Sequence, residues 1–190
     1  MKRRIKFKSA TYVGGVKLFT RIPHGHGRVE YTNGDSYEGD WKAGHRTGRG
    51  IYRYAGGDVY EGEFLNDKPH GRGKKTHAAD GEIYEGEWRD GQRHGFGKST
   101  YPDGTTIEAF YSMGVHSGPA QIIFPNGRIY QGPISGSRIK GFGYLVFPDD
   151  TTIEGEWDGV DTVANAVYTD ANGKKTRGRV ENGKFIPEGE

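Results

Sequence analysis

The sequence repeats itself with a period of about 23 residues over most of its length. A typical copy alternates rings with acids and Gly, then reaches a Gly-x-Gly triplet and a turn, and the copy at Tyr12 follows this pattern more loosely. The copies begin at Tyr12, Tyr37, Tyr60, Tyr84, Ile107, Tyr130 and Ile153, at intervals of 25, 23, 24, 23, 23 and 23 residues. Self-similarity at a fixed period is the signature of repeat architectures, in which each unit packs mainly on its neighbours. The repeat unit therefore determines what this chain can fold into.

The unit that begins at Tyr37 predicts a β-hairpin. Rings, acids and Gly alternate over residues 37–41, which is the period-two pattern of a strand with one buried face. Alternation resumes over residues 48–54 and ends at Ala55-Gly56-Gly57, a tight-turn sequence. About seven such hairpins predict an all-β, elongated, single-layer antiparallel meander of fourteen to sixteen strands, which twist should roll into a trough with the rings inside.

Three segments are expected within a single domain that has no internal linker. Residues 1–11 should form a basic N-terminal capping strand, because Ile5 and Phe7 alternate with basic residues. Residues 12–159 should form the repeats. In residues 160–190 the Gly-x-Gly becomes Ala164-Asn165-Ala166, so this segment is expected to be a decayed repeat or a C-terminal cap.

The recurring string Tyr-Glu-Gly-x-Trp, followed by Gly and then Gly-x-Gly, resembles the MORN repeat, most closely over residues 37–59 and 84–106. The resemblance covers roughly residues 12–159. It implies an elongated antiparallel scaffold that often dimerises and has no enzymatic activity of its own. MORN arrays occur in cytoskeletal, ciliary and membrane-junction proteins, and as accessory segments of lipid kinases and methyltransferases. The resemblance therefore does not specify a partner.

The composition argues against a catalytic, cofactor or metal site. The chain has no Cys, which excludes disulfides and thiolate chemistry and fits the reducing cytoplasm. No apolar run is long enough for a membrane span or a signal peptide. His24, His70 and His94 would align in a ladder, but positions two strands apart lie about 9.6 Å apart, too far to share an ion.

Paired acids at alternate positions recur in four hairpins, as Glu38/Asp40, Glu61/Glu63, Glu85/Glu87 and Glu154/Glu156. A catalytic pair is unique in its pocket. Recurrence instead favours cross-strand pairing with basic residues such as Arg49, Arg53 and Lys74.

Charge is concentrated at the N-terminus, where eight Lys and Arg residues and no acid precede Glu30. An arm built from these residues is a candidate contact for an acidic protein tail or for anionic lipid. The plainer alternative is a solvated strand face. The residues of this arm are Lys2, Arg3, Arg4, Lys6, Lys8 and Lys17.

The rings that should face inward are either pure core or core together with an open groove for a helix or an extended peptide. They are Tyr37, Trp41, Tyr54, Tyr60, Phe64, Tyr84, Trp88, Tyr101, Phe124, Tyr130, Phe147 and Trp157.

The middle repeats place apolar residues at outward positions where the other repeats carry charge. Such a patch is typical of a protein interface. The alternatives are that repeat decay turns this face inward, or that a terminal segment covers it. The candidate partner-binding residues are Phe96, Phe110, Pro119, Ile123, Pro133, Phe142 and Tyr144.

Together these features predict a non-catalytic scaffold that joins other proteins of a larger assembly, with a cytoskeletal, ciliary or flagellar (axonemal) context by family analogy. Self-association as a homodimer is a further option. The alternative function is a membrane-surface adaptor that binds anionic phospholipid through the basic arm. No nucleic-acid partner is expected, because beyond the arm no basic stripe accompanies the rings.

Overall fold

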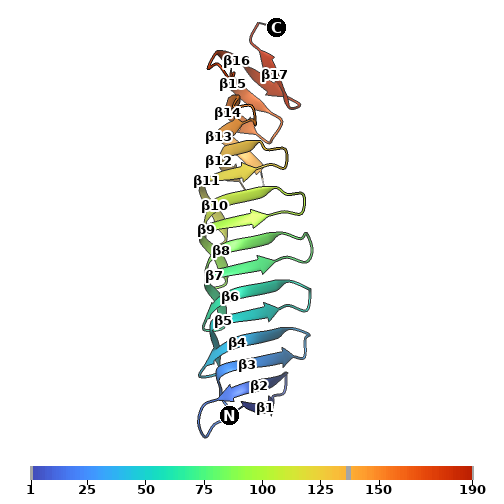
Figure 1. The fold of residues 1–190 in the computed structure, drawn as a ribbon, viewed down its shortest axis with the longest axis vertical. Helices are drawn as coiled ribbons and strands as arrows, with labels where there is room; N and C mark the ends of the chain where they lie inside the picture. Colours follow the sequence, from blue (N-terminus) through green and yellow to red (C-terminus); the bar gives the residue numbers. More distant parts are fainter. Residues whose placement is uncertain (1, 136–137, 190) are drawn as a thin grey trace. The chain divides into compact units, whose positions relative to one another are not determined.

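The computed structural model describes residues 2–135 and 138–189. In these ranges its regular elements are all β-strands, joined by turns and loops (Figure 1). The chain is an open antiparallel meander of 17 strands, which confirms the predicted fold class. The strand number exceeds the predicted fourteen to sixteen because the C-terminal segment forms a further regular hairpin. The chain divides into two compact units, residues 1–102 and 103–190, and each is described by itself.

The first unit contains nine strands, in which each strand pairs antiparallel with the next. They are β1 (Lys2–Lys6), β2 (Ala10–Val16), β3 (Pro23–Tyr31), β4 (Ser36–Lys42), β5 (His45–Arg53), β6 (Val59–Leu65), β7 (Lys68–Thr76), β8 (Ile83–Arg89) and β9 (Gln92–Thr100). Strand β1 pairs antiparallel with β2 at the start of the first hairpin, and its Ile5 is buried. Phe7 follows the strand and remains 47% exposed, so only half of the predicted apolar cover forms.

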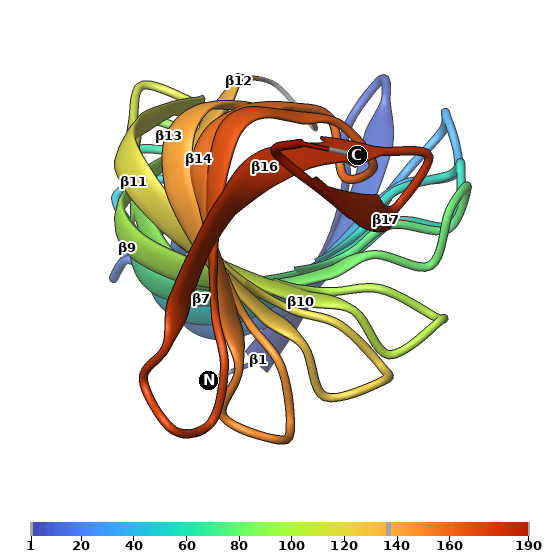
Figure 2. The same ribbon diagram turned by 90° about the horizontal axis from the view of Figure 1, so that it is seen from above.

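The second unit contains eight strands with the same consecutive pairing. They are β10 (Thr106–Ser112), β11 (Val115–Ile123), β12 (Ile129–Ser135), β13 (Arg138–Val146), β14 (Thr152–Asp158), β15 (Val163–Thr169), β16 (Lys175–Glu181) and β17 (Lys184–Pro187). Figure 2 shows that strands such as β11 and β13 are strongly curved.

The repeat motif works by packing one Tyr over two glycines. In β4 and β5, Gly39 lies opposite Gly50, and the ring of Tyr37 lies across both. A Cβ built on Gly50 would come within 2.5 Å of the Tyr37 hydroxyl oxygen, so only Gly fits. The hydroxyl donates to the carbonyl oxygen of Asp40 at 3.0 Å. The motif thus encodes a buried ring and the space that it needs.

The same arrangement recurs along the chain. Equivalent hydroxyls donate to the carbonyl three residues later from Tyr12, Tyr60, Tyr84 and Tyr130. Burial raises the pKa of Tyr130 to about 12, so the hydroxyl stays protonated as a donor at neutral pH. The indole nitrogens of Trp41, Trp88 and Trp157 donate to a glycine carbonyl of the preceding hairpin. These bonds tie each repeat to its neighbour.

Most of the predicted inward rings are core. Tyr37, Trp41, Tyr60, Phe64, Tyr84, Trp88, Tyr130 and Trp157 are buried, with edge-to-face ring contacts between consecutive repeats in the first unit. Tyr101, Phe124 and Phe147 are half-buried. Tyr54, at the hairpin end, is exposed.

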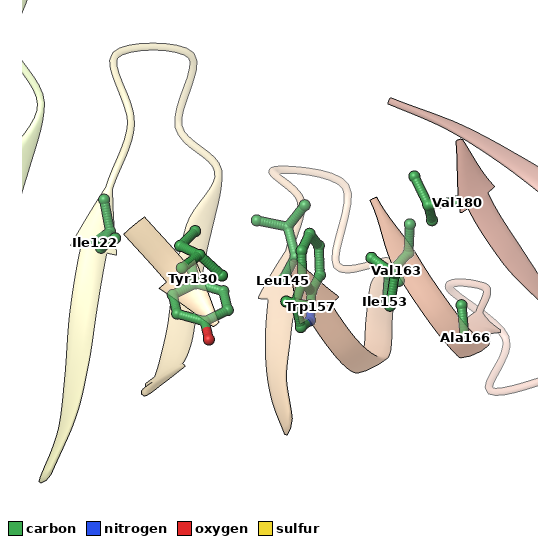
Figure 3. Close-up of a cluster of buried hydrophobic side chains, with 9 residues drawn as sticks. Ile122, Tyr130, Leu145, Ile153, Trp157, Val163, Ala166 and Val180 are labelled. Carbon is green, nitrogen blue, oxygen red and sulfur yellow. The ribbon is translucent and has the colours of Figure 1, made fainter. Parts of the chain in front are cut away.

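The second unit replaces part of this ring stack with aliphatic packing. Ile107 stands where the earlier repeats have Tyr, and the two opposed glycines become Ala109 and Ala120, which are paired and buried. Further along, one apolar cluster forms from Ile122, Tyr130, Leu145, Ile153, Trp157, Val163, Ala166 and Val180 (Figure 3). Loss of the Tyr ring and gain of a Cβ on the facing residues compensate for each other.

Candidate interaction surface

The face opposite the rings differs between the two units along one row of positions. This row is called here the outer row. In each repeat it contains the residue just before the Trp position on the first strand and the middle residue of Gly-x-Gly on the second strand. In the first unit it includes Asp40, Arg49, Glu63, Arg72 and Glu87. In the second unit the equivalent positions hold Phe110, Pro119, Pro133 and Phe142, followed by Glu156.

In the first unit the carboxylates of the outer row accept hydrogen bonds from backbone N–H groups. The backbone N–H of Arg49 donates to Asp40 Oδ2 at 3.2 Å, and that of Arg72 donates to Glu63 Oε1 at 3.1 Å. A third such bond joins Phe96 and Glu87 at 3.3 Å. Each donor follows a glycine with positive φ, where the register shifts in a β-bulge. These carboxylates therefore satisfy amides that the bulge leaves unpaired.

The cross-strand pairing with basic residues that was predicted for the paired acids is found at the first acid of two pairs, Glu38 and Glu85. Lys74 Nζ lies 2.9 Å from Glu85, and Arg28 lies 3.8 Å from Glu38. Sequence reasoning missed the backbone role of Asp40 and Glu63. The signal that could have found it is their constant distance from the first glycine of Gly-x-Gly.

In the second unit no backbone N–H requires a carboxylate acceptor at the position of Phe110. The residue after the left-handed Gly118 is Pro119, which has no backbone N–H to satisfy. The two rings are open to solvent, since Phe110 is 56% exposed and Phe142 is 50% exposed. At Phe110 and Pro119, the change from an acid to an apolar residue is thus matched by the loss of the backbone donor.

The predicted partner-binding residues of the second unit share one face. Pro119 pairs with Pro133 across β11 and β12, and Ile123 pairs with Ile129. The ring of Phe142 meets that of Tyr144 edge to face at 5.5 Å. Ile123 and Pro133 are half-buried and the other members are exposed. The apolar face, defined as Phe110, Pro119, Ile123, Pro133, Phe142 and Tyr144, is therefore open on the outside of the second unit.

Phe96, the remaining candidate residue, belongs to the first unit. It lies on β9 in the first unit, 45% exposed, and lines a hollow of about 370 Å³ together with Arg72, Lys74 and the acids of β8. Its neighbours on this face of the first unit are charged.

The basic arm is solvent-exposed. Lys2, Arg4 and Lys6 alternate with buried Ile5 on β1 and point away from the ring face, whereas Arg3 has the parity of Ile5. Lys8 follows the strand, and Lys17 begins the loop between β2 and β3. The structure places all six residues in the first unit and gathers four of them on one short strand.

Two charge clusters lie in the first unit, one buried around Glu82 and one partly exposed around Asp67. Glu82 is 7% exposed, accepts two hydrogen bonds from Arg93 and one from Ser99, and lies near His77. Burial opposes ionisation of Glu82, but the bonds from Arg93 and Ser99 outweigh it and hold the pKa below its usual value. Asp67 receives bonds from the backbone and side chain of Arg46 and lies against His45, and its pKa is lowered in the same way.

The remaining chemistry-bearing residues do not converge. His70 and His94 of the predicted ladder pair across strands with Glu63 and Glu87, in separate hairpins. Within residues 2–135 and 138–189, no three His, Asp or Glu side chains are grouped in a way that could hold a metal ion. No helix able to cross a membrane occurs in the described part of the chain.

Comparison with protein families adds to this geometry. The model of the MORN repeat matches residues 22–36, 37–59, 60–79 and 84–106. This is a MORN-repeat protein. Two of the matched segments, 37–59 and 84–106, keep the Tyr, the Trp and the glycines of the motif, whereas segment 60–79 has Phe64 in place of the Trp. The aliphatic repeats that carry the apolar face lie beyond residue 106, where the motif has changed. No curated protein matches the sequence as a relative.

Solved structures share the fold at low sequence identity. The TCP domain of SAS-4 from Drosophila melanogaster, determined in complex with a proline-rich motif of Ana2, is 17% identical, with 93% of this chain and 88% of that chain covered and a TM-score of 0.54. The TCP10c domain of Drosophila melanogaster Sas-4 is 16% identical, with 93% and 98% covered and a TM-score of 0.51. These MORN repeats therefore resemble a second group of open antiparallel β-domains.

Proposed function

We propose that this MORN-repeat protein is a non-catalytic scaffold that binds an extended segment of another protein on the apolar face of its second unit. The observation that carries this proposal is the exposed row of Phe110, Pro119 and Phe142 at positions that bear charge in the first unit. Exposed contiguous apolar residues are costly on a soluble protein and typically mark interaction sites.

Two further features support a peptide-like partner. The face is a strip that follows the outer row across four strands, which suits an extended chain more than a globular surface. The SAS-4 TCP domain, which shares the fold, was solved with a proline-rich motif bound. We place the protein in a multi-subunit cytoskeletal, ciliary or flagellar assembly, because MORN arrays recur in such structures.

The decisive experiment combines crosslinking in a native extract with a paired variant. Phe110→Ser with Phe142→Ser should remove crosslinks that map to residues 106–146 and leave the melting temperature unchanged within about 2 °C, since exposed substitutions cost little. The matched control is Arg49→Ser with Arg72→Ser, which changes the outer row of the first unit. Unchanged crosslinking in the Phe variant would overturn the proposal, as would a large loss of stability.

A second candidate function, binding to anionic membrane, is favoured by the placement of Lys2, Arg4 and Lys6 on one exposed side of β1. Charge-driven adsorption weakens as salt screens it, with a Debye length of about 10 Å at 0.1 M. Cosedimentation with phosphatidylserine vesicles should then fall as salt rises and disappear on deletion of residues 1–8. A protein interface on the apolar face should survive both changes.

A further inference from the structure

A pocket opens on the ring face of the first unit, at the end where the array begins. It has a volume of about 570 Å³ and lies between β2, β3, β4 and the loop of residues 17–22. Its walls are mainly apolar and include Phe7, Tyr12, Ile22, Pro23, Tyr31 and Trp41. This volume falls within the range of about 300–1,000 Å³ that is typical of ligand sites.

Comparison with the next repeat explains why the space is open. In the second repeat, the guanidinium of Arg46 lies 4.8 Å from the ring centre of Tyr52 and 5.6 Å from that of Tyr37. The register pairs Arg46 with Trp41. The side chains of Trp41, Arg46 and Tyr52 together fill this part of the ring face.

The first repeat has smaller residues at all three equivalent positions. Val16 stands for the Trp, Pro23 for the Arg and Val29 for the Tyr, as the Val16–Pro23 pairing and the Gly-x-Gly spacing show. None of these three residues supplies a counterpart of the Arg46 side chain, so the space beside Tyr31 and Trp41 is open while Tyr12 itself is fully buried.

The charge at the pocket favours an acidic occupant. Arg21 lines it and is exposed, and Lys8 and Lys17 flank the lining segments in sequence. Asp67 is the one acid among the described lining residues, and Arg46 and His45 already bind its carboxylate. Since no acid precedes Glu30, the rim is positive.

The rim is also ordered before any ligand arrives. The backbone of Lys17 donates to Ile22 O at 2.9 Å, and the Thr20 hydroxyl donates to Lys17 O at 2.8 Å. These bonds close the loop and leave Phe7 and Ile22 exposed at the pocket edge. A preformed site loses less conformational entropy on binding.

We propose that this pocket is a docking site for an acidic segment of a partner protein that inserts one bulky apolar side chain between Tyr31, Pro23 and Trp41. The apolar side chain takes the space of the missing Arg, and its acidic neighbours meet Arg21. The site lies on the ring face of the first unit and shares no residue with the apolar face of the second.

The test uses the full chain and a phage library of random twelve-residue peptides. Selection on the wild-type protein should enrich peptides that combine acids with a Phe, Leu or Trp. Parallel selection on Pro23→Arg, which restores the Arg of the neighbouring repeat, should not enrich them. A second plugging variant, Val29→Tyr, restores the missing ring and guards against a folding defect in the first.

The enriched peptide is then synthesised with a fluorophore and titrated by anisotropy. Pro23→Arg should weaken binding at least about tenfold, and Arg21→Glu about fivefold through loss of charge complementarity. Arg53→Glu makes the same charge change on an exposed residue of β5 away from the pocket and should stay within about twofold. Phe110→Ser should have no effect, which separates this site from the proposed scaffold face.

Three outcomes would overturn the proposal: enrichment of basic or neutral peptides, equal enrichment on wild-type and Pro23→Arg protein, or no enrichment at all. Phosphatidylserine vesicles are titrated in parallel. If they bind and Pro23→Arg reduces that binding, the pocket serves a membrane and the assignment to an acidic peptide is wrong.

Discussion

The two units use the same backbone position for different purposes. In the first unit, Asp40 and Glu63 accept hydrogen bonds from amides that the bulge leaves unpaired. In the second unit, Phe110 takes that position opposite Pro119, which has no amide hydrogen. Once the backbone no longer needs a carboxylate, the position is available for an exposed ring. In this hairpin the loss of the amide donor and the gain of the exposed ring therefore go together, whereas in the next hairpin Pro133 replaces the acid although Phe142 keeps its N–H.

The buried faces differ in a parallel way. The first unit stacks rings over glycine pairs, and the second replaces one such set with Ile107, Ala109 and Ala120. Each set is internally consistent, since a large ring requires bare glycines and a smaller Ile allows methyl groups beneath it. Mixing the two sets should therefore be costly.

The largest expected effect comes from mixing them. Gly39→Ala would place a Cβ about 2.5 Å from Arg49 O and from the Cα of Gly50, with the Tyr37 ring also in contact. We expect a loss of about 3–4 kcal/mol in the stability of the first unit, at the upper end for overpacking. The reverse change, Ala109→Gly, should cost only about 1 kcal/mol. Hydrogen exchange, read on peptides from each unit, measures both.

Transplanting the whole set sharpens this comparison. The triple variant Tyr37→Ile, Gly39→Ala, Gly50→Ala should be more stable than Gly39→Ala alone, because Ile removes the Tyr37 side chain that both new methyl groups would strike, while the contact of the methyl group at position 39 with the backbone of residues 49 and 50 is common to both variants. A triple variant less stable than the single one would show that the two sets are not interchangeable solutions.

The next largest effect concerns charge in the ring face. Glu82→Ala removes the carboxylate that accepts hydrogen bonds from Arg93 and Ser99 in a mostly buried site, so we expect a loss of about 3 kcal/mol. At the position of Ser99, which donates to Glu82, the second unit has the buried residue Ile122. Chemical denaturation, monitored by hydrogen exchange of peptides from each unit, should show that the loss of stability lies in residues 1–102. A loss below about 1 kcal/mol would contradict a structural role for the pair.

Lowering the pH should destabilise the first unit more than the second, by a smaller amount than the substitutions above. The pKa values of Asp67 and Glu82 in the folded first unit lie below their ordinary values of 3.8 and 4.5. The unfolded chain therefore binds protons first, and this stability is present above about pH 4.5 and is lost as pH falls through the lowered values. Asp35 and Asp58 are lowered too, by the Tyr52 hydroxyl and the Ala78 amide respectively.

In residues 103–189 as described, Asp149 alone shows such a lowering, from its bonds to Thr151. Thermal unfolding, monitored by hydrogen exchange at a series of pH values from 6 to 3, should thus show that the first unit loses more stability than the second. Equal losses would mean that these carboxylates contribute little to folding.

Much of this fold was predictable because the motif is a local packing rule. The spacing of Tyr, Gly and Trp fixed the strands, the buried face and the outward position of Phe110 and Phe142. The pocket at Pro23 was not predictable, because it depends on how Val16, Pro23 and Val29 of the first repeat, each smaller than its counterpart, pack across paired strands. The division after Pro102, with Phe96 in a different unit from the other candidate residues, also depends on packing across strands and leaves no mark in the repeat.

The smallest expected effects test the outer row itself. Glu63→Ala removes the acceptor for the amide of Arg72 and should cost about 1 kcal/mol, the usual net worth of a partly exposed hydrogen bond. Phe110→Ser removes an exposed ring opposite Pro119 and should change stability by less than about 0.5 kcal/mol. Denaturant midpoints of the two variants give the comparison directly. If Phe110→Ser proves as costly as Glu63→Ala, the ring is part of the core of the second unit, and the row there is structural in both halves of the chain.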